Sequence, residues 1–165
     1  MTKRALVALF ACLMVAVAAG CGGGGDSTSS GGESSEASGS APTKAAFVKE
    51  ADALCRKADD ELNEEVESYA KENGIPLGKE PTKPQLEEIY KEVVLPNVAR
   101  QGEEIDALTA PEGDEDEVGE IVAALDQGVE EGEADPSGLV EGKNPLEDAS
   151  SKATAYGLKV CGSEG

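Results

Sequence analysis

The sequence contains no histidine and no tryptophan, and basic side chains are scarce. Without histidine the chain lacks the commonest general base and metal ligand, so proton transfer or metal binding would fall to carboxylates and thiols. Only 14 Lys and Arg residues face 34 Asp and Glu residues, which gives a formal net charge of −20. A chain with this charge repels phosphate backbones, so we expect no nucleic-acid partner.

Motifs of the common enzyme classes are also missing. The sequence has no GxSxG, HExxH or phosphate-binding loop. Carboxylates are so numerous that no pair of them stands out as a general acid and base. We therefore expect a protein that is not an enzyme, with no catalytic residue and no cofactor.

Residues 1–20 are typical of an export signal. Lys3 and Arg4 precede residues 5–19, which carry no charge. As a helix this run would be about 22 Å long, shorter than the roughly 30 Å hydrocarbon core of a membrane. A basic start and a short apolar run followed by small residues predict a signal peptide rather than a membrane span.

The end of this segment, Val-Ala-Ala-Gly-Cys at residues 17–21, resembles the lipobox of bacterial lipoproteins, with Ala18 where leucine is usual. The resemblance implies cleavage before Cys21 and a diacylglycerol on its sulfur. The protein would then be extracytoplasmic and anchored to the outer face of the cell membrane. The anchor would be stable, because several acyl chains hold a protein firmly in a membrane whereas a single chain binds only marginally. The alternative is an ordinary signal peptide cut after Ala19 or Gly20, which leaves Cys21 as a free thiol.

A low-complexity linker follows Cys21. Residues 22–42 contain seven Gly and seven Ser and no aliphatic side chain larger than alanine. Such a chain buries too little apolar surface to order itself, so residues 21–42 are predicted to form a disordered tether. Its root-mean-square reach would be about 25 Å.

Residues 43–162 are predicted to form the folded domain. They carry 30 acidic and 12 basic residues, and 21% of them are Leu, Ile, Val or Phe. This apolar content is just above the roughly 20% below which highly charged chains stay unfolded. We therefore expect a domain whose stability is marginal without a cross-link.

Apolar residues in this region recur every three or four positions, which predicts helices and no strands. A first helix is expected from residue 43 to the stop at residues 73–74. A second is expected to begin with a capping box of Thr82 and Gln85, to kink near residues 92–96 because of Pro96, and to end at residues 110–111.

A third helix is expected to start at Asp114, with Glu117 in a capping-box position, and to end before a loop at residues 135–138. Asn144 and Pro145 are expected to start a last helix that reaches Val160. Four amphipathic helices pack most simply as an antiparallel bundle, so the predicted fold class is an all-α, four-helix antiparallel bundle.

Two cysteines are left for the folded domain, because Cys12 lies in the signal segment and Cys21 in the lipobox. An exported compartment favours oxidation, so we expect a Cys55–Cys161 disulfide. Closing a loop of this length stabilises a fold by roughly 4–5 kcal/mol in the chain-entropy model. The alternative, a reactive or metal-binding thiol pair, lacks both CxxC spacing and histidine.

Both ends of the domain carry a recognisable pattern. Residues 47–55 read Phe-Val-Lys-Glu-Ala-Asp-Ala-Leu-Cys, and residues 156–162 read Tyr-Gly-Leu-Lys-Val-Cys-Gly. These segments resemble the two ends of a domain in small lipoproteins of high-GC Gram-positive bacteria, and the Leu-Thr-Ala-Pro at residues 108–111 resembles its middle. The resemblance implies a helical fold and a Cys55–Cys161 pairing. It brings no established activity, so no catalytic residue is carried over.

Acidic residues are concentrated between Arg100 and Lys143, where 15 acids occur without one base. They are densest at four consecutive positions: Asp114, Glu115, Asp116 and Glu117. This patch could attract divalent cations weakly, or it could attract a basic protein partner. The alternative is that it is only a solvated helix face. A dedicated calcium loop is excluded, because Val118 and Leu125 fall where oxygen ligands are required, so no metal site is predicted.

These observations favour a non-catalytic, membrane-anchored envelope lipoprotein with a structural or protein-binding role. The alternative is a helical module that binds a small ligand or a cation. An exposed apolar patch of several hundred Å² would favour the first. An apolar cavity between the helices, near Pro96, or carboxylates converging from different helices would favour the second.

Overall fold

Every regular element in residues 41–163, which are the residues that the computed structural model describes, is helical. This confirms the all-α prediction for this part of the chain. The predictions for the signal segment, for Cys21 and for most of the linker lie outside the described residues. Among the described helices, none combines the length and the apolar character needed to cross a membrane.

The first helix, α1, spans Lys44–Glu72. Its N-cap is Thr43, whose side-chain oxygen accepts a hydrogen bond of 3.2 Å from the amide of Ala46. The helix ends where Gly74 adopts a positive φ of 66°, a conformation that other residues rarely take. Both ends agree with the prediction, because they depend on local residues alone.

The second predicted helix consists of α2 (Lys83–Ile89), the π-helical segment η1 (Tyr90–Val94) and α3 (Leu95–Asp106). The capping box of Thr82 and Gln85 is present. Pro96 lies in the first turn of α3, where its missing N–H matters least. Before it, the amide of Leu95 bonds to the carbonyl of Tyr90, five residues back. The interruption expected near Pro96 therefore takes the form of one wide turn.

The remaining elements are α4 (Glu115–Ala134), α5 (Pro136–Val140) and α6 (Glu147–Tyr156). The prediction of a loop at residues 135–138 is wrong, because Asp135 is the N-cap of the short helix α5 at this place. The last helix is also shorter than predicted. It begins at Glu147, after the Asn144 side chain has accepted a hydrogen bond from the amide of Leu146, and ends at Gly157, whose φ is 115°.

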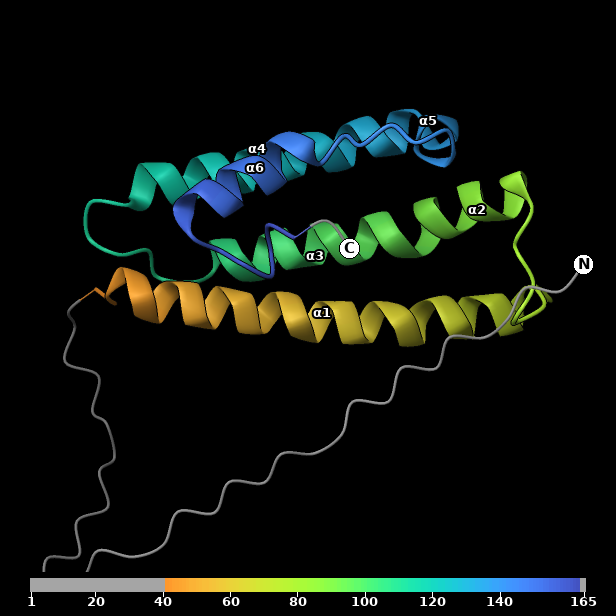
Figure 1. The fold of residues 1–165 in the computed structure, drawn as a ribbon, viewed down its shortest axis with the longest axis horizontal. Coiled ribbons are helices and arrows are strands. Elements are labelled where there is room, and N and C mark those ends of the chain that lie inside the picture. The colour runs from red at the N-terminus through yellow and green to blue at the C-terminus, as the bar shows by residue number, and fades with distance from the viewer. Residues whose placement is uncertain (1–40, 164–165) are drawn as a thin grey trace, which may run out of the picture. The chain divides into compact units, whose positions relative to one another are not determined.

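The helices pack in chain order, with α3 against both α1 and α4, and with α6 against α4. Figure 1 shows α2, η1 and α3 returning along α1, and α4 and α6 lying side by side beyond them. After α6 the chain turns back to α1, where Cys161 is bonded to Cys55, with 5.3 Å between their Cα atoms. This confirms the predicted disulfide, although Cys161 lies beyond α6 and not at its end.

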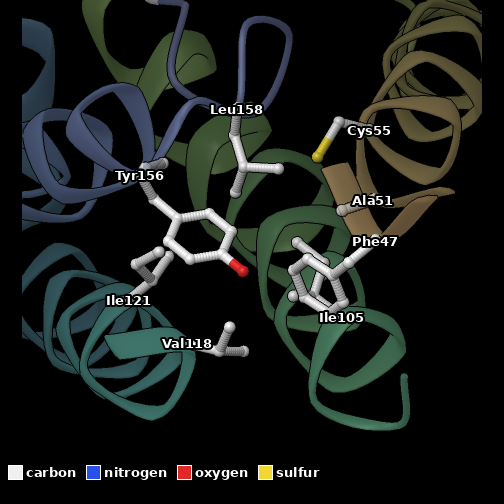
Figure 2. Close-up of a cluster of buried hydrophobic side chains, with 9 residues drawn as sticks. Phe47, Ala51, Cys55, Ile105, Val118, Ile121, Tyr156 and Leu158 are labelled. Carbon is white, nitrogen blue, oxygen red and sulfur yellow. The ribbon is translucent and has the colours of Figure 1, made fainter. Parts of the chain in front are cut away.

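A core of nine buried side chains joins α1, α3, α4 and α6 (Figure 2). Phe47 and Tyr156 meet edge to face, with ring centroids 5.9 Å apart, an arrangement that aromatic pairs favour. The cluster comprises Phe47, Ala51, Cys55, Ile105, Val118, Ile121, Ala153, Tyr156 and Leu158. A smaller cluster of Ala70, Ile75 and Ile89 closes the far end of α1. Ala37–Gly165 form a compact unit that contains both clusters and the disulfide.

Candidate functional site

A groove of about 470 Å³ lies between α1, the η1–α3 segment, α4, α6 and the loop that joins α5 to α6. Its floor consists of buried side chains, among them Leu95, Ile121 and Ala149. Its walls are half-buried apolar side chains: Leu62, Tyr90, Val94, Val98, Leu125 and Leu146. A mainly apolar space of this size falls within the range of ligand pockets in proteins.

The groove exists because one of its sides is built from small residues. On α6 the residues that face it are Ala149, Ser150 and Ala153. A helix in a filled bundle core would place large side chains such as leucine at these positions. The chain beyond Gly157 adds Val160, Cys161 and Ser163 to the lining.

Most polar groups in the lining already have partners within the protein. The Gln101 side-chain amide donates to Asn97 Oδ1 at 2.9 Å. Ser150 Oγ donates to the carbonyl of Gly162 at 2.7 Å. Lys143 Nζ lies 2.6 Å from Asp135 Oδ2. A molecule in the groove would therefore meet mainly apolar surface.

Asp135 fixes the loop that forms one wall of the groove. Its carboxylate accepts hydrogen bonds from Lys143 Nζ at 2.6 Å, from Ser137 Oγ at 2.9 Å and from the Gly138 amide at 3.0 Å. The hydrogen bonds from Lys143, Ser137 and Gly138 lower the pKa of Asp135 to about 2. In turn, the hydrogen bond to Asp135 and the negative charge of that residue raise the pKa of Lys143. Both shifts favour the charged pair, which holds Lys143 at the groove.

This arrangement predicts how the loop responds to acid. The pKa of Asp135 is lowered in the fold from 3.8 to about 2, so the contribution of its carboxylate to stability is complete above the unfolded value and is lost as the pH falls toward the folded one. A carbon-detected NMR titration should give a midpoint near 2 for Asp135 and, in Lys143→Ala, a midpoint closer to 3.8. A midpoint near 3.8 in the unmodified protein would show that the pair does not form.

Asp52 on α1 holds the chain beyond α6, a role that the sequence did not reveal. Its side chain is buried, with 7% of its surface exposed. Oδ1 accepts from three consecutive backbone amides, those of residues 159, 160 and 161, at 3.0, 2.9 and 3.4 Å. These contacts and the disulfide position the segment that contributes Val160 and Cys161 to the lining of the groove. The only signal was the aspartate in the motif at residues 47–55.

Asn97, at the interface of α1 and α3, was also missed. Its side chain is fully buried, and its Nδ2 donates to the Ala58 carbonyl and to Glu65 Oε2, both at 3.3 Å. Arg100 Nη2 lies 2.9 Å from Glu65 Oε1 and continues the network. Because buried polar groups need partners, this network fixes α3 against α1 beside the groove.

The acidic patch lies at the start of α4. Asp114 is the N-cap residue, but its carboxylate makes no capping hydrogen bond, so the expected capping-box role is wrong. Instead it accepts from the Tyr156 hydroxyl at 2.9 Å and lies 3.6 Å from Lys44 Nζ. Burial and this hydrogen bond raise the pKa of Tyr156.

Of the other carboxylates of the patch, only Glu117 shares a partner with Asp114. Glu117 pairs with Lys44 at 3.6 Å, and Glu115 folds back to accept from the Gly113 amide at 2.7 Å. Asp116 is exposed in the first turn of α4. Within residues 41–163, no group of three or more acidic, histidine or cysteine side chains could hold a metal ion.

No protein-family model, curated protein or solved structure matches this chain. The groove is therefore judged on its own geometry and chemistry. It is large, mainly apolar, and bounded by helices that the disulfide and two buried polar side chains hold in place.

Proposed function

We propose that the domain is a non-catalytic binding module that takes up one small, mainly apolar molecule in the groove. The observation that carries this proposal is the volume of about 470 Å³, since ligand pockets span roughly 300–1,000 Å³ and are lined mostly by apolar side chains. The position of the groove also supports the proposal, since a cavity near Pro96 was the feature that would favour a ligand-binding module. The lining residues Val94, Leu95 and Val98 flank this proline. On the described surface, Leu77 alone is a large exposed apolar side chain.

We further infer that the protein is an exported lipoprotein, anchored through Cys21 and carrying the binding domain on the tether of residues 21–42. The signal-like segment and the lipobox resemblance support this, and a disulfide suits an oxidising compartment. In this proposal residues 43–162 are a four-helix antiparallel bundle in which α2, η1 and α3 count as one helix. The likeness of its two ends to high-GC Gram-positive lipoproteins fits the same picture.

The proposal is tested by titrating the Ala37–Gly165 unit with the neutral fluorophore N-phenyl-1-naphthylamine. We expect saturable fluorescence enhancement with one molecule bound per domain. Val98→Trp and Leu125→Trp place a bulky ring in the groove from two different helices, α3 and α4, so each should weaken binding at least about tenfold. Two variants are used because overpacking can destabilise a fold.

Val122→Trp is the matched control, because Val122 is a half-buried valine of α4 that does not line the groove. It should bind the fluorophore as tightly as the unmodified domain. Circular dichroism identifies which variants remain folded. Absence of saturable binding, or equal affinity in folded groove variants and in the control, would refute the proposal.

A further inference from the structure

We propose that the ligand of the groove carries an amine or quaternary ammonium group beside its apolar body, and that Asp59 recognises this cation. The inference rests on the proposed function and adds the ligand class. Its starting point is that only two side chains in the lining carry a charge, Asp59 and Lys143. The state of these two charges decides which ligand head group the groove accepts.

The charge of Lys143 is already neutralised. Its Nζ lies 2.6 Å from Asp135 Oδ2, and the Asp135 carboxylate is held in turn by the Ser137 hydroxyl and the Gly138 amide. An anion bound at Lys143 would compete with the Asp135 carboxylate for the same ammonium group, and would do so in a domain whose net charge repels it. The groove therefore offers no ready site for a carboxylate, sulfate or phosphate head group.

Asp59, in contrast to Lys143, carries a charge that is not paired with another side chain within residues 41–163. It lies on α1 between Cys55 and Leu62, both of which also line the groove, and these spacings place the three residues on one face of the helix. Asp59 is exposed, and among the described residues no ion pair or hydrogen bond involves its carboxylate. It is thus a negative charge that remains available at the edge of an apolar space.

The field of the whole domain acts in the same direction. Residues 43–162 carry 18 more acids than bases, so anionic amphiphiles are repelled and cations are concentrated near the surface. A simple hydrated metal ion gains nothing from the apolar walls, whereas an alkyl or aryl ammonium compound contacts both the walls and the carboxylate. Charge and shape together select a small cationic amphiphile.

The test compares three ligands that share one tail: decyltrimethylammonium, decanol and decanoate, each displacing N-phenyl-1-naphthylamine from the Ala37–Gly165 unit. We expect the ammonium compound to bind tightest and decanoate weakest. In Asp59→Asn the affinity for the ammonium compound should fall about two- to fivefold, the range of an exposed ion pair, while that for decanol stays unchanged.

Asp60→Asn is the matched control, since it removes the same charge from the next residue of α1, which is exposed and does not line the groove. It should leave the preference for ammonium intact. Equal effects of the two substitutions, or no preference over decanol, would overturn this inference and leave the groove as a site for neutral ligands. If neither decanol nor the fluorophore binds, the proposed function fails as well.

Discussion

Reducing the Cys55–Cys161 disulfide is expected to lower the melting temperature of the domain by roughly 10–20 °C. The bond joins residues 106 positions apart, and closing so long a loop stabilises a fold by roughly 4–5 kcal/mol in the chain-entropy model. For a typical domain stability of about 5–15 kcal/mol this is a large share. The share is larger here because 18 excess negative charges oppose compaction.

The measurement is thermal unfolding followed by circular dichroism, with and without reductant. A double variant, Cys55→Ser with Cys161→Ser, provides the control, because it should melt like the reduced protein and show no response to reductant. Equal melting temperatures for the oxidised and reduced protein would mean that helix packing alone supplies the stability.

Replacing Asp52 by alanine is expected to destabilise the domain by roughly 3 kcal/mol, because three amides at residues 159–161 lose a charged acceptor in a partly buried site. Asp52→Asn should lose less, since an amide oxygen still accepts hydrogen bonds but without the charge. Hydrogen exchange at residues 159–161 should speed up in both variants, and by a larger factor than exchange in the middle of α4, which responds only to the change in global stability.

Asp60→Ala is the comparison for this effect, because Asp60 is exposed on the same helix and should change stability by no more than about 0.5 kcal/mol. Asp52 and the disulfide secure the same segment, so their effects should not add. In a double-mutant cycle, Asp52→Ala should cost less in the protein without the disulfide than in the protein with it. Fully additive losses would show that the two devices act on separate parts of the fold.

Features set by neighbouring residues were predictable from the sequence. The caps at Thr43 and Thr82 and the stop at Gly74 each depend on residues within one turn. The disulfide was predictable because the predicted signal segment and lipobox account for Cys12 and Cys21, which leaves Cys55 and Cys161 as the pair in the folded domain. The sequence suggested the neighbourhood of Pro96 as the place to look for a cavity, but it did not predict that one exists or how large it is.

Features that depend on distant partners were not predictable. The helix α5 exists because Asp135 caps it and is itself held by Lys143, eight residues along the chain. Asp114 binds Tyr156, 42 residues away, in place of its own helix. The volume of the groove depends on small α6 residues facing half-buried side chains of other helices, a comparison that requires the packed structure.

The position of the disulfide near the start of α1 also determines how the domain transmits mechanical force. A pull on the chain before Thr43 reaches Cys55 after about three turns of helix and passes through covalent bonds to Cys161. Only residues 44–54 can peel away, and the Lys44 ion pairs and the Phe47–Tyr156 contact resist that first step. When the opposing force acts at the C-terminal end of the chain, tension beyond Cys55 passes through the disulfide and bypasses α3, α4 and α6. The groove walls that these three helices form then carry no load, whereas Cys55 and Cys161, which also line the groove, do.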